Sequence, residues 1–264
     1  MKVIDVIKHL ESVGTWVNWD KTRDVVLHGS TDKEITKMGV CWVATKQVIE
    51  QAQKLGINFI ISHENMFYEA TTSPTRQLLE SANEKRRMLD EGNITVYRCH
   101  DVWDMMPSYG VADIWSRDIG LKFEPRVINS YNSFAYVSDM TVQDLAQKIA
   151  NALVQYEQEG IQVVGDLNKQ ISRVAIGTGA ATNIFSMLKF NPDVVVVSDD
   201  GINNWIAVQW CIDNKLPVII VNHASCEIGG LQNMVTYFNE VMPTLDVQYL
   251  YEGYKIQVVL GKEN

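Results

Sequence analysis

The segment that decides the fold is residues 58–67, which read NFIISHENMF. It contains the apolar run Phe59–Ile61, and a histidine, His63, follows that run after one small residue. A short, uninterrupted apolar run is typical of a strand buried on both faces, as strands in parallel sheets are. The same pattern returns at residues 94–104 (ITVYRCHDVWD) and 217–227 (PVIIVNHASCE). The sequence therefore predicts buried parallel strands, each followed by a histidine.

Helical patterns alternate with short apolar runs along the rest of the chain. Alternation of strand and helix is typical of an α/β fold with mostly parallel sheets. Further strands are expected at 40–44, 174–176, 193–197, 246–251 and 255–259. Helices are expected at 46–55, 75–89, 109–119, 141–153, 202–212 and 231–240.

One segment, residues 120–133, shows neither period and contains several turn-forming residues, among them Gly120 and Pro125. Segments of this composition often separate domains. We expect two α/β lobes of similar size, residues 1–125 and 126–264, with the third histidine motif on the second lobe.

The composition narrows the class of protein. The chain has 264 residues, a formal net charge of −9 and 46% hydrophobic residues, which is ordinary for a globular protein. An acidic chain is a poor binder of nucleic acid, because that affinity rests on Lys and Arg neutralising phosphates. No segment reaches the roughly 18 to 20 apolar residues that a membrane span needs. The four cysteines form no C-x-x-C pair, so we expect free thiols in a cytoplasmic protein.

Three of the five histidines, His63, His100 and His223, lie directly beyond a predicted buried strand. Ligand sites in open parallel sheets form outside the carboxyl ends of the strands. One histidine at a strand end is usually a hydrogen-bonded core residue. Three in the same position favour a shared site.

Each of these histidines also has a carboxylate nearby. One acid follows its histidine directly, and the other two come four residues later, a spacing that places both side chains on one side of a helical turn. Imidazole and carboxylate are ligands of borderline divalent metals. Six candidate ligands exceed what one tetrahedral ion can use, so we expect two ions that share a carboxylate. The acids are Glu64, Asp104 and Glu227.

A dinucleotide site is an alternative. Gly177-Thr178-Gly179 follows a predicted strand and resembles the start of G-x-G-x-x-G, and Asp199 lies twenty residues after Gly179. Thr182 stands where the third glycine would be, and this reading leaves the histidines unexplained. A tight turn between strand and helix accounts for the glycines more simply.

Two further alternatives concern the histidines themselves. The nitrogen and oxygen groups could form a hydrogen-bonded cluster without metal. The protein could also be a non-enzymatic scaffold or regulator in which the ions are structural, because closed metal sites lack the open position that catalytic sites keep.

The three motifs resemble those of the family of NGG-one-interacting factor three, whose members are known as GTP cyclohydrolase I type 2 homologues. The family's strand ending in Ser-His-His is matched by residues 61–64. Its His-Thr-x-x-Asp is matched by residues 100–104, and its Gly-His-x-x-x-Glu by residues 222–227. The resemblance covers nearly the whole chain.

The resemblance implies a metal-dependent hydrolase of the cyclohydrolase kind, which acts on a nucleotide or related small molecule. It implies two divalent ions per chain, Zn, Mn or Fe, held in the cleft between the lobes, and a ring-shaped homohexamer. His100 would lie beside the ions as a ligand or a catalytic proton relay. The implied metal ligands are His63, Glu64, Asp104, His223 and Glu227.

The chain departs from the family pattern in two places. Glu64 replaces a second histidine, which shifts the preference toward harder ions such as Mn²⁺ or Fe²⁺. The family's Thr-Gly-Glu/Asp strand end, followed by a histidine, is here Ser198-Asp199-Asp200-Gly201, and no histidine follows. Asp199 and Asp200 could face the substrate pocket, but we expect them to cap the helix that begins near Ile202.

Overall fold

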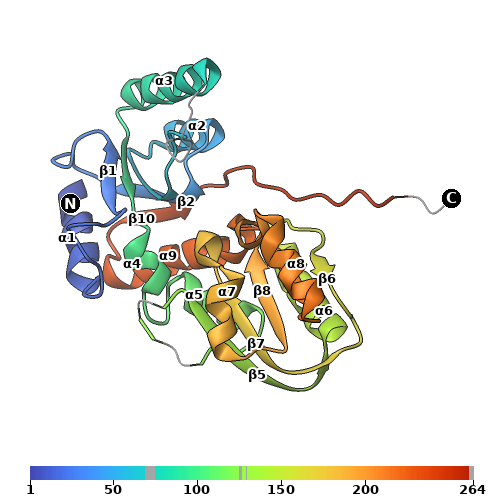
Figure 1. The fold of residues 1–264 in the computed structure, drawn as a ribbon. Coiled ribbons are helices and arrows are strands. Elements are labelled where there is room, and N and C mark those ends of the chain that lie inside the picture. The colour runs from blue at the N-terminus through green and yellow to red at the C-terminus, as the bar shows by residue number, and fades with distance from the viewer. Residues whose placement is uncertain (69–74, 125–126, 129, 262–264) are drawn as a thin grey trace. The chain divides into compact units, whose positions relative to one another are not determined.

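Two five-stranded sheets organise the chain, one in each of two units. The structure, a computed structural model, describes residues 1–68, 75–124, 127, 128 and 130–261 (Figure 1). The first unit comprises Met1–Gly110 and Gly230–Gly253, and the second comprises Val111–Gly229 and Tyr254–Asn264. No helix in the described ranges is both long and apolar enough to span a bilayer.

The sheet of the first unit has the order β1-β4-β3-β2-β10. Four of its strands are parallel, and only β1, at one edge, runs antiparallel to its neighbour. The three central strands are nearly fully buried, which explains their continuous apolar runs. The strands are β1 (Val25–His28), β2 (Lys37–Val43), β3 (Phe59–Glu64), β4 (Thr95–Arg98) and β10 (Asp246–Tyr249).

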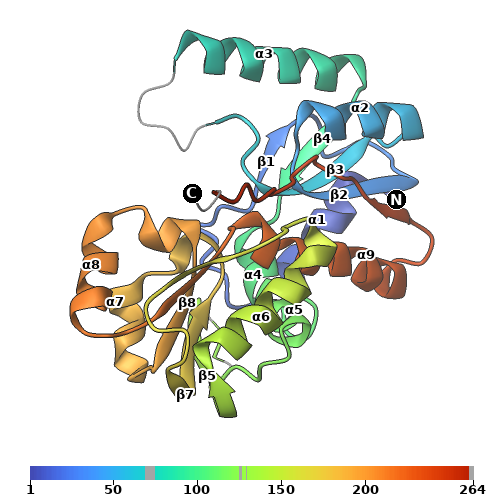
Figure 2. The ribbon, with the colours of Figure 1, turned by 90° about the vertical axis from the view of Figure 1, so that its right-hand side faces the viewer.

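Helices cover both faces of this sheet, with α2 and α3 on one face and α1 and α9 on the other (Figures 1 and 2). Helix α2 shows why they form where they do. The side chain of Thr45 accepts from the Val48 backbone N–H at its start, and Gly56 in the left-handed region ends it. The helices are α1 (Val3–Val13), α2 (Lys46–Leu55), α3 (Arg76–Glu91), α4 (Asp101–Met105) and α9 (Ile228–Val241).

The sheet of the second unit has the order β5-β7-β8-β9-β6, with three parallel central strands and an antiparallel strand at each edge. Figure 2 shows this sheet between α7 and α8 on one side and α6 on the other. The strands are β5 (Asn132–Thr141), β6 (Gln162–Val164), β7 (Gln170–Gly177), β8 (Val194–Ser198) and β9 (Val218–Val221). The helices are α5 (Val111–Asp118), α6 (Val142–Leu153), α7 (Ile184–Met187) and α8 (Trp205–Asp213).

The predicted α/β class is confirmed, and the expected helices and central strands appear within a few residues of their predicted bounds. The edge strands β1, β5 and β6 were not predicted, because β1 and β6 have only four and three residues and polar residues interrupt β5. β5 begins inside the segment expected to lack regular structure. The strand expected at 255–259 is wrong, since this stretch makes a single isolated bridge at Ile256.

The units also differ from the lobes expected at 1–125 and 126–264. The change from one unit to the other falls after Gly110, and the segment Gly230–Gly253 returns to the first unit. The reason is strand pairing, since β10 adds to the edge of the first sheet beside β2. Pro125 and Arg126, at the expected boundary, lie outside the described residues.

Candidate metal centre

The carboxyl ends of β3 and β4 bring two of the predicted histidines together. Ser62 pairs with Arg98 in this parallel ladder, so the residues that follow them are neighbours. The rings of His63 and His100 stack with their centroids 4.5 Å apart and an angle of 8° between their planes.

Asp104 joins these histidines from helix α4. Its Oδ1 lies 3.4 Å from His63 Nε2, and its Oδ2 lies 3.1 Å from His100 Nδ1. Potential ligand atoms of the three residues lie within 4.8 Å of one another. The first unit therefore contains a candidate metal-ligand group.

A backbone carbonyl fixes the orientation of His63. The Nδ1 atom lies 3.1 Å from the carbonyl oxygen of Cys99. Because a carbonyl only accepts, Nδ1 must carry the hydrogen, and in the neutral ring Nε2 keeps its lone pair. That lone pair and the facing oxygen of Asp104 repel each other unless a proton or a cation lies between them. His63 is fully buried, so bulk water cannot screen this repulsion.

Glu64 lies at the same strand end and is an ionised carboxylate. Its Oε2 accepts from Arg98 Nη2 at 2.7 Å, and its Oε1 lies 3.6 Å from His100 Nε2. Burial favours the neutral acid, but the hydrogen bond to His100 and the nearby positive charges outweigh it and lower the pKa of Glu64 to about 2. The predicted ligand Glu64 is thus present at the strand end, and the Arg98 guanidinium already contacts one of its oxygens.

His100 is surrounded by carboxylates. Burial lowers its pKa, but Asp104, Asp101 and Glu64 outweigh burial and raise the pKa to about 10. The imidazole therefore holds a proton between acidic groups when no ion is bound. This environment suits a group that stores or passes a proton.

Asp24, from the loop before β1, positions the start of α4. Its carboxylate accepts from the backbone N–H groups of His100, Asp101 and Val102 at 2.5, 2.7 and 2.9 Å. Thr22 adds a hydrogen bond to the Asp101 side chain. No local pattern marks Asp24 in the sequence, where it lies in a polar loop that follows Trp16 and Trp19.

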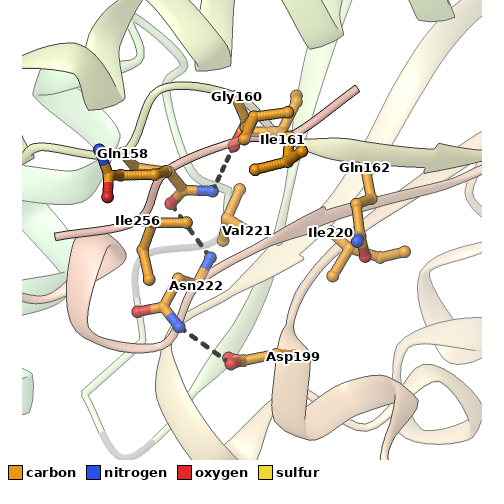
Figure 3. A pocket seen from close by; sticks show the side chains of 12 residues that line it. Gln158, Gly160, Ile161, Gln162, Asp199, Ile220, Val221, Asn222 and Ile256 are labelled. Atoms are coloured by element: carbon orange, nitrogen blue, oxygen red, sulfur yellow. Dashed lines mark hydrogen bonds between the residues drawn. The ribbon is translucent and has the colours of Figure 1, made fainter. Parts of the chain in front are cut away.

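The third predicted motif lies at the carboxyl ends of β8 and β9 in the second unit. His223 Nε2 is 3.2 Å from Glu227 Oε2, and its Nδ1 is 2.7 Å from Asp200 Oδ2. Asp199 holds this segment, because its Oδ1 accepts from the His223 backbone N–H at 2.8 Å. Its Oδ2 accepts from the side-chain Nδ2 of Asn222 at 3.0 Å (Figure 3).

The expectation that Asp199 and Asp200 cap the following helix is wrong. Helix α8 begins at Trp205, and its cap is Asn204, which accepts from the Ile206 backbone N–H. A short 3₁₀ turn, Asp199–Ile202, intervenes and leaves both carboxylates at the strand end, where they contact the third motif.

Gly179 explains the glycine motif that suggested a dinucleotide site. It has φ of +56°, and a Cβ atom there would collide with the Glu227 carboxylate and lie 2.8 Å from His223 Nε2. The hydroxyls of Thr182 and Ser198 donate to its carbonyl oxygen at 2.9 and 2.8 Å. The glycine therefore makes room for the histidine–carboxylate pair, a role that the sequence analysis missed.

The predicted site residues come together within each unit. His63, Glu64, His100 and Asp104 come together in the first unit, and His223 and Glu227 come together in the second. Each group lies at the carboxyl ends of parallel strands, as the sequence analysis expected.

The fold and these groups define a mixed α/β protein with histidine and carboxylate metal-ligand candidates at the strand ends of both sheets. The chain belongs to the Duf34/NIF3 family (NGG1p interacting factor 3), whose model matches residues 1–253. The resemblance inferred from the three motifs is therefore confirmed.

Relatives of known sequence and structure agree with this assignment. A Clostridium perfringens protein named GTP cyclohydrolase 1 type 2 homolog is 24% identical over 206 residues, which cover 75% of this chain and 78% of that protein. A Nostoc sp. protein of the same name is 26% identical over 253 residues, 89% of this chain and 90% of its own. The crystal structure of Staphylococcus aureus protein SA1388 superposes with a TM-score of 0.78 at 20% identity, over 98% of this chain and 99% of that one, which shows the shared fold.

Proposed function

We propose that this protein binds two divalent metal ions and is a metal-dependent hydrolase of a nucleotide or related small molecule. The ligands in this proposal are His63, Glu64, Asp104, His223 and Glu227, and His100 is the proton relay. The names of the curated relatives support the cyclohydrolase class.

The observation that carries the proposal is the contact between His63 Nε2 and Asp104 Oδ1, 3.4 Å apart in a buried position. Two acceptors at this distance call for a positive charge between them. A ligating histidine usually donates its other N–H to a carbonyl or carboxylate, and the Nδ1 of His63 contacts such a carbonyl. A divalent cation fits this arrangement.

The second unit supplies the same kinds of donor. His223 and Glu227 adjoin each other at a strand end, and Gly179 leaves the space around them free of a side chain. In our proposal these two residues belong to the ligand set.

The donor set consists of imidazole nitrogens and carboxylate oxygens, which suits Zn²⁺, Mn²⁺ or Fe²⁺. When bound, such ions supply Lewis acidity and make water a stronger acid. His100 lies within 3.6 Å of Glu64 and 3.1 Å of Asp104, so it can hold a proton beside the ligands and return it to a leaving group. The hexameric ring and the cytoplasmic location stay predictions; the mass of the particle in solution tests the first.

Elemental analysis of protein purified without chelator tests the metal centre. We expect about two transition-metal ions per chain in the wild type. His63→Ala and His223→Ala should each lose metal. The control His28→Ala should not, because His28 lies on the edge strand β1 and pairs with Asp90 of α3. Unchanged metal content in both site variants contradicts the ligand assignment.

Turnover separates an enzyme from a metal-containing scaffold. Metal-loaded protein should convert GTP or a related nucleotide, followed by chromatography, and the metal-free protein should not. His100→Gln should retain metal and lose most of the turnover, by about 100-fold or more, because a relay residue contributes to proton transfer. A loaded wild type inert toward a panel of nucleotides supports the scaffold instead.

A further inference from the structure

We propose that Asp200 is a positioning residue that holds the imidazole of His223 with Nε2 available to a metal ion. The inference rests on the proposed function, because it assigns a role toward the bound ions. It concerns a residue that none of the three sequence motifs contains.

The contact that carries the inference joins Asp200 Oδ2 and His223 Nδ1, 2.7 Å apart. This is the length of a charge-assisted hydrogen bond. An ionised carboxylate only accepts, so Nδ1 is the donor and carries a hydrogen. In the neutral ring the lone pair then lies on Nε2, which faces Glu227 Oε2 at 3.2 Å. Because the Asp200 contact is the shorter of the two, it favours the tautomer with the hydrogen on Nδ1, in which Nε2 can ligate a metal on the Glu227 side.

The sheet register brings the two residues together. Ser198 pairs with Val221 in the parallel ladder of β8 and β9. The second residue beyond each strand end is then Asp200 on one side and His223 on the other. Asp199, the residue before Asp200, accepts from the His223 backbone N–H at 2.8 Å. Two consecutive acids therefore hold the same histidine, one by its backbone and the other by its ring.

The His223 ring is less enclosed by packing than the His63 ring. Its side chain is 18% exposed, whereas that of His63 is fully buried and packed on every side. Outer contacts of metal-ligating histidines set both ring orientation and ligand basicity. Asp200 is 38% exposed, so its carboxylate keeps contact with solvent and avoids the cost of full burial.

The alternative roles of Asp200 are not supported. It does not cap α8, because Asn204 does so. Among the described residues, Asp200 is also absent from the groups whose ligand atoms lie close enough together to share an ion.

Metal affinity tests the inference. Zn²⁺ and Mn²⁺ are titrated into metal-free full-length protein against a competing chelator. Asp200→Ala should weaken binding by about 10- to 100-fold, the usual effect of removing an outer-shell partner. Asp200→Asn should weaken it less, because the amide oxygen can still accept from Nδ1. The matched control Asp213→Asn, an exposed acid at the end of α8, should bind like the wild type.

A second readout follows the tautomer directly. ¹⁵N spectra of histidine-labelled, metal-free protein are recorded in alkaline buffer, where the ring is neutral. The wild type should show His223 protonated at Nδ1, and Asp200→Ala should shift the proton toward Nε2. A merely structural role would leave the tautomer unchanged. If the alanine variant does not fold, Asp200→Asn carries both measurements, with a smaller expected loss of affinity.

The outcomes separate the two proposals. A wild type that binds metal, together with an Asp200→Ala variant of equal affinity and unchanged tautomer, overturns the inference alone. A wild type that binds neither ion overturns the proposed function, and with it the role of Asp200 toward an ion.

Discussion

Each unit has a histidine ring at a strand end, and different contacts orient the ring in the two units. In the first, the ring of His63 is buried and its Nδ1 faces the carbonyl oxygen of Cys99. In the second, the ring of His223 is partly exposed and its Nδ1 faces the carboxylate of Asp200. A neutral dipole suffices where packing already fixes the ring, whereas the more open ring is paired with an anion.

Both arrangements depend on strand register. Ser62 pairs with Arg98 in one sheet, and Ser198 pairs with Val221 in the other. In each case the residues just beyond a parallel pair face each other, and one of them is a histidine. The difference teaches that the register determines which residues meet, and the local sequence determines whether a carbonyl or a carboxylate faces the ring.

The largest effect on the second unit should come from Gly179→Ala. The new Cβ would collide with the Glu227 carboxylate, and the residue would keep a positive φ. We expect a loss of about 2–4 kcal/mol in the free energy of unfolding, measured with urea, together with weaker metal binding. The matched control is Gly56→Ala, which has φ of +66° but no atom within 4 Å of the new Cβ. It should cost only about 1–2 kcal/mol. Equal losses in the two variants would show that Gly179 makes no special room.

The corresponding break in the first unit is Asp24→Ala. It removes the acceptor of three backbone N–H groups at the start of α4, and the site is buried. We expect a loss of about 2–3 kcal/mol in the free energy of unfolding and a weaker metal site, because His100 and Asp104 lose their support. Asp20→Ala, at an exposed position of the same loop, is the control and should be nearly neutral. A stable Asp24→Ala variant with intact metal binding would argue against this support.

A double-mutant cycle on Arg98 and Glu64 sharpens the comparison of charge in the two units. The pair is 2.7 Å apart, and neither side chain is more than about a quarter exposed. Arg98→Met alone should destabilise metal-free protein, and Glu64→Gln should recover part of the loss, with a coupling energy of about 1–2 kcal/mol by urea unfolding. Strictly additive effects would mean that the ion pair contributes nothing to the cluster.

The same pair predicts a pH dependence. The pKa of Glu64 lies near 2 in the folded, metal-free chain, below its ordinary value of 4.5. The folded state thus favours the ionised form, so the stability that Glu64 adds is complete above about pH 4.5 and is lost as the pH falls toward 2. The difference in unfolding free energy between wild type and Glu64→Gln should shrink over this window. A difference that stays constant down to pH 2 would contradict the assignment.

The smallest effect should come from Asn204→Ala, which removes the cap of α8. We expect a loss of about 1 kcal/mol in the unfolding free energy and no change in metal affinity. Asp200→Asn should show the reverse pattern, with a change in metal affinity and little change in stability. If instead Asp200→Asn lowered stability and Asn204→Ala lowered metal affinity, Asp200 rather than Asn204 would be the residue that supports α8.

The sequence predicted the central strands well, for a physical reason. β9 was expected from the apolar run in residues 217–227 and spans Val218–Val221, because a strand buried on both faces must be apolar at every position. β5 was missed because its buried positions hold the small residues Ser133 and Ala135, whereas Phe134 and Tyr136 are more exposed, and Gly, Pro and Asn residues precede it. The three histidine motifs were found because each follows one of the fully buried strands.

The supporting residues could not be found in the same way. Asp24 is 76 residues from His100 in the chain, and Asp200 is more than twenty residues from His223. Their roles depend on which strands pair and in which register, which no local pattern encodes. The glycines at 177 and 179 were visible in the sequence as the start of a phosphate-binding motif. The structure shows that Gly179 is needed because the Glu227 carboxylate lies beside it.

The path of the chain has a consequence for any attempt to dissect the protein. It passes from one unit to the other after Gly110, Gly229 and Gly253, so that each unit is assembled from two separate stretches. A gene fragment that encodes only residues 1–110 would produce a sheet without its β10 edge, and it would expose the apolar side of β2 to aggregation. Natural exchange of one half for another by recombination would face the same obstacle, so the two halves of this protein are expected to be inherited together.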